Sequence, residues 1–174
     1  MAELLVPEVA TYRMEYDVTR ALGTGVQLGT EQKTAWTFRS AGPKGVQSEE
    51  CRALYVAPTD CSVLPVILTG FDVPVDALNR AEAGKRFGFT LTTSRQAGYT
   101  GDKDIAGAKV SVSYDDGATW RNADVRVGDN GSHRVSVRHP RRAETNGFVA
   151  LRVEVWDNAG NRTTQTIKRA YALD

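Results

Sequence analysis

The sequence has no hydrophobic run close to the roughly 20 apolar residues that a membrane-spanning helix needs. It also has no excess of charge of one sign, because 22 Lys and Arg residues stand against 21 Asp and Glu residues, a net charge of +1. A membrane span is therefore not expected, and no overall field attracts nucleic acid. The first residues, MAELLVPEVA, lack the basic and apolar regions of a signal peptide. An export signal, if the protein is secreted, is expected to lie upstream.

Histidine is scarce, and its placement argues against catalysis. By strand parity the two histidines, His133 and His139, fall on the same side as Val135 and Val137, near the two ends of one predicted strand and roughly 20 Å apart. Neither belongs to a glycine-rich turn that would present a nucleophile beside a base. Two distant imidazoles do not make a metal centre. Both histidines are predicted to have structural or edge roles, and the chain alone is not expected to be an enzyme or to carry a cofactor.

Cysteine is scarce as well. Cys51 and Cys61 lie ten positions apart in a segment, residues 40–62, that is rich in Ser, Gly, Pro and acidic side chains. In an oxidising compartment such a pair normally forms a disulfide, which would contribute about 2 to 3 kcal/mol. The alternatives are two unpaired thiols in a cytosolic protein or, less favoured without a second Cys pair or a nearby His, a zinc site. The pair predicts a long loop closed by a disulfide, and a secreted protein.

Helical periodicity is absent, whereas alternation of apolar and polar residues recurs from end to end. The run at 12–18 predicts a first strand, and the run at 35–38 is expected to pair with it in an antiparallel manner. Residues 63–71 are apolar on both faces, as in a strand buried between layers. Further strands are predicted at 87–91, 110–114, 120–125, 135–137, 149–155 and 163–171.

The turns between these runs support a sandwich. Residues 115–118, Asp-Asp-Gly-Ala, and residues 157–161 predict hairpins, because Gly and Asn tolerate the positive φ angles of tight turns. About seven short strands joined by such turns predict an antiparallel sandwich of the immunoglobulin or fibronectin type III kind. The chain is thus predicted to be all-β, with a small N-terminal β unit over 1–71 that holds the Cys51–Cys61 loop, and the immunoglobulin-like sandwich over 72–174.

Two kinds of candidate site remain. Asp115, Asp116 and Asp157 offer hard oxygen ligands for calcium, together with Asn158 and Asn161. The favoured interpretation is that these residues cap turns through their own hydrogen bonds, so no metal is expected.

Aromatic and basic side chains give the second kind. Trp120 beside a hairpin tip and Trp156 on the outward side of its strand could stack on a sugar or a peptide, although packing at the edge of the sandwich is favoured. Arg138 belongs to a cluster that could contact an acidic partner, although a solvated face is the more usual reading; its other members are Arg134, Arg141 and Arg142.

Five segments are distinctive when taken together: TAWTFRSA at 34–41, LPVILTGFDVPVDALNRA at 64–81, VSVSYDDGATWRNADV at 110–125, VSVRHP at 135–140 and FVALRVEVWDNAGNRTTQTIKRAYAL at 148–173. They resemble the C-terminal region of secreted bacterial subtilisin-like serine peptidases. DDGATW and DNAGN recur in many bacterial sandwich domains, so the likeness rests mainly on residues 34–81. In that family the catalytic Asp, His and Ser lie in an upstream α/β domain, and no position here matches their motifs.

The resemblance implies a non-catalytic accessory region of an extracellular peptidase. Such a region would stabilise or position the protease domain of the same polypeptide, or engage protein substrate. The alternative is an extracellular module of another secreted protein that binds carbohydrate or a cell surface.

Overall fold

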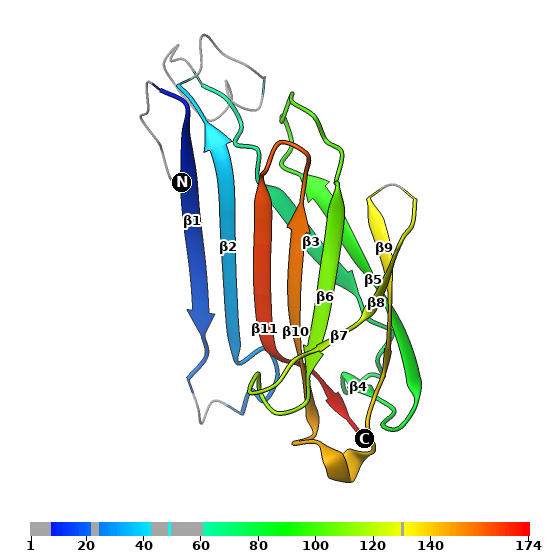
Figure 1. Ribbon diagram of the computed structural model, residues 1–174. Coiled ribbons are helices and arrows are strands. Elements are labelled where there is room, and N and C mark those ends of the chain that lie inside the picture. The colour runs from blue at the N-terminus through cyan, green and yellow to red at the C-terminus, as the bar shows by residue number, and fades with distance from the viewer. Residues whose placement is uncertain (1–7, 22–24, 43–48, 50–60, 130) are drawn as a thin grey trace.

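The computed structural model describes residues 8–21, 25–42, 49, 61–129 and 131–174. Within these ranges the chain is nearly all β and forms two antiparallel sheets that pack as a sandwich, which confirms the predicted fold class (Figure 1). The large sheet contains β1 (Ala10–Thr19), β2 (Glu31–Ser40), β4 (Arg80–Ala81), β6 (Gly107–Ser113), β7 (Arg121–Asn122), β10 (Phe148–Trp156) and β11 (Arg162–Leu173). The small sheet contains β3 (Ile67–Asp72), β5 (Arg86–Arg95), β8 (Asp124–Val127) and β9 (Ser132–Arg138).

The strand order places distant parts of the chain side by side. The large sheet runs β1-β2-β11-β10-β6-β7, with β4 beside the end of β11, and the small sheet runs β3-β5-β9-β8. Strand β1 pairs with β2 in an antiparallel register from Ala10 opposite Ser40 to Thr19 opposite Glu31, as the alternation predicted. A 3₁₀ turn, Arg142–Glu144, lies between β9 and β10.

The predicted boundary at residues 71 and 72 does not coincide with a gap between sheets. Strand β2 pairs with β11 from Thr37 opposite Arg162 to Glu31 opposite Lys168. Strand β3 spans the predicted boundary and pairs with β5 in the other sheet. Residues 10–40 therefore extend the large sheet of the sandwich. The predicted disulfide stays a prediction, because Cys51 lies outside the described residues; Cys61 is buried.

The core lies between β6, β10 and β11 on one side and β3, β5 and β9 on the other. The alternation that predicted β10 is its pattern of burial, since Val149, Leu151 and Val153 are at most 1% exposed while Arg152 between them is exposed. Burying one such side chain contributes about 1.5 to 3 kcal/mol. The other fully buried members include Ile67, Leu91, Val110, Val135, Val155 and Tyr171.

Both histidines point into this core, on the side that strand parity predicted. His133 is 3% exposed and His139 is 1% exposed. The Nδ1 atom of His139 lies 3.1 Å from the hydroxyl oxygen of Tyr114, and its ring packs against Phe87 with centroids 5.0 Å apart. Burial lowers the pKa of His139 to about 4, so its imidazole is neutral at neutral pH.

The prediction of one returning strand over residues 120–125 is wrong. The chain pairs with β6 through β7 in the large sheet, and then crosses to the small sheet, where β8 pairs with β9. Ala123 marks the crossing, and its N–H donates to the carbonyl of Val110 (2.9 Å). Alternation of apolar and polar residues is the same in either sheet, so it cannot reveal such a crossing.

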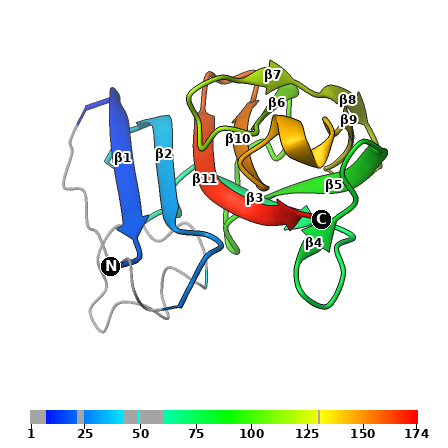
Figure 2. The same ribbon diagram turned by 90° about the horizontal axis from the view of Figure 1, so that it is seen from below.

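The large sheet is wider than the small one, so β1 extends beyond it (Figure 2). Strand β3 lies over β11 and β2, because the carbonyl of Ile67 accepts hydrogen bonds from Trp36 Nε1 (3.0 Å) and Thr163 Oγ1 (2.7 Å). On the far side of these contacts Tyr12 of β1 packs against Phe38 of β2, with ring centroids 6.0 Å apart. Among the described residues, the inward face of β1 therefore contacts mainly β2.

Candidate functional site

The outward face of the large sheet is hollowed along β2 and β11 because these strands carry small residues there. Ala35 lies directly opposite Thr164 in the β2–β11 pair. Longer charged residues flank them, Glu15 opposite Ala35 on β1 and Glu154 opposite Thr164 on β10. Successive outward positions of a strand lie on one face, so the small residues form a floor between two charged walls.

Two adjoining hollows of about 150 and 220 Å³ follow this floor, and both are lined by Lys33 and Thr166. We call them together the outer groove. The first hollow is lined by Arg13, Glu15, Asp17, Thr34, Ala35 and Thr164. The second is lined by Glu31, Asp116, Gly117, Trp120, Ala150, Arg152 and Lys168.

One end of the outer groove is formed by the turn after β6. Asp116 (φ 56°) and Gly117 (φ 97°) adopt the left-handed conformation that the Asp-Gly signal predicted. The carboxylate of Asp115 accepts hydrogen bonds from Ser113 Oγ (2.6 Å) and from the N–H and hydroxyl of Thr119 (2.9 and 2.5 Å). These donors lower the pKa of Asp115 to about 2. The turn is thus fixed by its own side chains.

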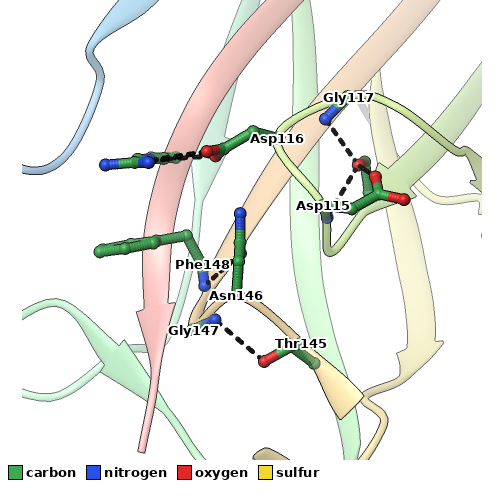
Figure 3. A network of polar contacts seen from close by, with 9 residues as sticks. Asp115, Asp116, Gly117, Thr145, Asn146, Gly147 and Phe148 are labelled. Atoms are coloured by element: carbon green, nitrogen blue, oxygen red, sulfur yellow. Dashed lines mark hydrogen bonds and ion pairs between the residues drawn. The ribbon is translucent and has the colours of Figure 1, made fainter.

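A second contact ties this turn to β11 (Figure 3). The carboxylate of Asp116 accepts hydrogen bonds from Nε and Nη2 of Arg169, at 3.0 and 2.7 Å. Arg169 has a φ of 53°, and it lies where the β10–β11 register shifts. Its guanidinium also covers the ring of Phe148, 4.5 Å from the centroid. The hydrogen bonds from Arg169 hold the pKa of Asp116 below its usual range, so both charges persist at neutral pH.

Trp120 forms part of the groove wall and has little free surface for stacking. The guanidinium of Arg152 lies 4.0 Å from its ring centroid, and its Nε1 donates to the carbonyl of Gly117 (2.9 Å). Trp156 lies farther along the same face, where a Cβ on Gly107 would come within 2.4 Å of the indole ring. The two tryptophans therefore share a face, and Trp120 lines the groove whereas Trp156 does not.

Charges of both signs surround the groove, and most are paired. Arg13 and Glu15 lie 2.6 Å apart, and Lys33 and Glu31 lie 2.7 Å apart. The hydrogen bond from Lys33 lowers the pKa of Glu31. Among the described residues, no carboxylate lies within ion-pair distance of the cations that flank Trp120 and Ala150, which are Arg152 and Lys168. These two cations are available to an anionic group of a ligand.

The candidate calcium ligands are not brought together. Asp115 and Asp116 follow the end of β6, whereas Asp157 follows β10, which runs antiparallel to β6, so the two sets lie at opposite ends of the sheet. Asp157 is buried and accepts hydrogen bonds from Arg95 Nη2 (2.6 Å) and from the Asn161 N–H and side-chain amide (2.8 and 2.7 Å). Although burial favours its protonated form, these bonds lower its pKa. In the described part of the chain no cluster of three or more potential metal ligands occurs.

Arg138 lies on the opposite face of the molecule. It is exposed on the outward side of the small sheet, directly opposite Arg86 of β5. Arg134 is likewise opposite Arg126 of β8. The three candidate contact residues, Trp120, Trp156 and Arg138, thus do not form one site. The residues that the sequence analysis missed are the small ones of the floor, whose only signal is their outward position in two predicted strands.

These features define an immunoglobulin-like β-sandwich with a polar groove across one sheet. Comparison of the sequence with protein-family models and with curated proteins finds no match. Among the described residues, no helix is long and apolar enough to cross a membrane.

Proposed function

We propose that the chain is a non-catalytic accessory module that binds an extended polypeptide segment in the outer groove. The observation that carries this proposal is the groove itself, with a floor of small residues such as Ala35 and Thr164 between charged walls. An extended segment presents backbone polar groups and charges of both signs, which match the hydroxyl groups of the floor and the mixed walls. Exposed ion pairs each contribute about 0 to 1 kcal/mol, so the affinity is expected to be moderate.

The state of Trp120 favours a polypeptide over a sugar. A sugar ring stacks on a free aromatic face. Arg152 already covers one face of the Trp120 ring, and the indole N–H of Trp120 already donates a hydrogen bond to the carbonyl of Gly117. Arg152 lines the groove and forms no ion pair among the described residues, so it can bind a carboxylate of the bound segment. Trp156, outside the groove, supports carbohydrate binding as the second candidate function, because its strand position is outward and its side chain is only partly buried.

Such a module would work as part of a larger secreted enzyme. The likeness of residues 34–41 and 64–81 to the C-terminal region of secreted subtilisin-like peptidases supports an accessory region of such an enzyme. The bound polypeptide is then protein substrate or a segment of the linked catalytic domain. The gene tests this part of the proposal: an in-frame signal peptide and subtilisin-like domain upstream of Met1 support it, and a start codon at Met1 overturns it.

The binding experiment uses reduced, carboxymethylated α-lactalbumin as a permanently unfolded probe. Thr164→Arg places a long side chain on the floor, and it is expected to weaken binding about tenfold or more. Thr92→Arg makes the same substitution on the outward face of the small sheet and serves as the matched control. Equal affinities of the two variants, or no binding by the unmodified chain, would overturn the proposal. Binding to a glycan array that is lost in Trp156→Ala would establish the second candidate instead.

A further inference from the structure

The exposed edges of the two sheets are unequal. Strand β7 has two residues, β8 four and β3 six, whereas β1 has ten. Within the described residues β1 pairs only with β2, in a register without a bulge. Natural edge strands are usually protected by short length, charged side chains, Pro or bulges. Strand β1 is long and has no Pro and no bulge, and its charged side chains, Arg13, Glu15 and Asp17, are of both signs, so they can pair with a strand of complementary charge. Among the described residues no other strand covers its outer row of backbone donors and acceptors.

The inward side of β1 is also incompletely covered. Tyr12, Met14 and Val18 are half-buried, and Tyr16 is 60% exposed. In β10, at the centre of the same sheet, the inward residues are fully buried. A strand added beside β1 would therefore satisfy its backbone and cover its apolar side chains together.

The charges and aromatic side chains of β1 are complementary to those of a second, antiparallel copy of the same strand. Two copies related by a two-fold axis pair in an antiparallel manner. If Met14 faces Met14 of the second copy, Arg13 faces Glu15 of the second copy, and the symmetry repeats this opposite-charge pair. Tyr12 faces Tyr16 in the same register, also twice, which covers the exposed tyrosine. Directly opposite pairs of this kind stabilise antiparallel strands.

The neighbouring symmetric registers are unfavourable. A pairing centred on Arg13 places this residue against itself, and one centred on Glu15 places that carboxylate against itself. A pairing centred on Tyr16 places Glu15 against Asp17. Like charges directly opposite each other destabilise a strand pair. Among these central registers, the one centred on Met14 has an opposite-charge pair and no like-charge pair.

We infer that β1 is a dimerisation edge, through which two copies of the chain join their large sheets by antiparallel β1–β1 pairing centred on Met14. The two-fold axis that relates the two copies is perpendicular to the joined sheet. The two outer grooves therefore lie on the same face of that sheet. The inference does not depend on what the groove binds, because it rests on the length, register and charges of β1.

A charge-reversal series tests the register by sedimentation velocity over a range of concentrations. The unmodified chain is expected to form a dimer. Arg13→Glu and Glu15→Arg each create two like-charge pairs, and each is expected to weaken the dimer about tenfold or more. The double variant restores both opposite-charge pairs and is expected to restore the dimer. Arg162→Glu, on the same face but two strands from the edge, is the matched control and should leave dimerisation unchanged.

A covalent test does not depend on these affinities. In antiparallel pairs, the Cα atoms of directly opposite residues lie about 4.5 to 5.5 Å apart, within the reach of a disulfide. Met14→Cys should therefore cross-link two copies on oxidation, with mass spectrometry identifying the peptide linked through position 14. Tyr16→Cys, whose counterpart lies several residues away along the partner strand, should not. A monomeric unmodified chain, a double variant without recovery, or equal cross-linking at positions 14 and 16 would overturn the inference.

Discussion

Buried His139 should make the stability of the sandwich fall as the pH falls from about 6.5 toward 4. Burial lowers the pKa of this imidazole from 6.5 to about 4. The unfolded chain therefore takes up a proton as the pH falls through about 6.5, whereas the folded chain stays neutral until about pH 4. The unfolded state binds more protons in this interval, so the free energy of unfolding decreases. The stabilising effect is fully present above the unfolded pKa.

The magnitude follows from the two pKa values. One pKa unit corresponds to about 1.4 kcal/mol, so the full effect is about 3 kcal/mol near pH 4, and the part between pH 7 and pH 5 is about 2 kcal/mol. Carboxylates contribute little in that upper interval, because they titrate near pH 4 in the unfolded chain. Asp116 and Asp157, whose pKa values are lowered, lose their stabilising contribution only at still lower pH. The interval from pH 7 to pH 5 therefore isolates the histidines.

The assay is urea unfolding, followed by tryptophan fluorescence at pH 7, 6 and 5. His139 alone should account for a loss of about 2 kcal/mol across this range, so His139→Gln should lose about 2 kcal/mol less than the unmodified chain, whatever its stability at pH 7. Burial lowers the pKa of His133 too, so the unmodified chain should lose somewhat more than about 2 kcal/mol, His133→Gln should flatten the slope in part, and the double variant should be nearly flat. An unmodified chain with constant stability from pH 7 to pH 5 would refute the reasoning. A His139→Gln variant that keeps the full slope would do the same.

Two further predictions concern local packing, and both are measured by chemical unfolding. Arg95→Met leaves Asp157, whose side chain is 5% exposed, buried without its cation, and should cost about 3 to 5 kcal/mol; a cost below 1 kcal/mol would show that the pair is solvated. Gly131→Ala should destabilise the protein clearly more than Gly84→Ala, although both glycines have a φ near 73°. A Cβ on Gly131 would lie 2.8 Å from the Thr93 carbonyl oxygen, whereas a Cβ on Gly84 would meet no atom within 4 Å. Equal losses of stability in the two variants would contradict this packing.

The local features of the fold could be predicted because they depend on neighbouring residues. The hairpin at 157–161 joins β10 to β11 with Trp156 opposite Arg162, as its turn residues indicated. The positive φ angles of Asp116 and Gly117 follow from the same chemistry. Alternation likewise placed His133 and His139 on the buried side of their segment.

The non-local features could not be predicted. Residues 31–37 pair with residues 162–168, and nothing in either segment specifies a partner so distant in the sequence. The alternation therefore could not show that β2 joins the large sheet through β11. The crossing at Ala123 was missed because alternation has the same period in both sheets.

The candidate site depends on the same non-local pairing. Ala35 and Thr164 form one floor only because β2 and β11 are neighbours. Tryptophan and arginine attracted attention in the sequence because their side chains are large, yet Trp120 is a wall of the groove that Arg152 already covers. The groove exists because the side chains of its floor are smaller than those of the strands beside it. A small residue in a sequence does not indicate a groove until the neighbouring strands are known.

The most direct test of the proposed function is a nuclear magnetic resonance titration of the isotopically labelled chain with reduced, carboxymethylated α-lactalbumin. The account predicts amide shift changes along the outer groove, at Ala35, Thr164 and Thr166, and none on the outward face of the small sheet around Arg138. Changes confined to the small sheet or to the surroundings of Trp156, or an unchanged spectrum, would contradict it.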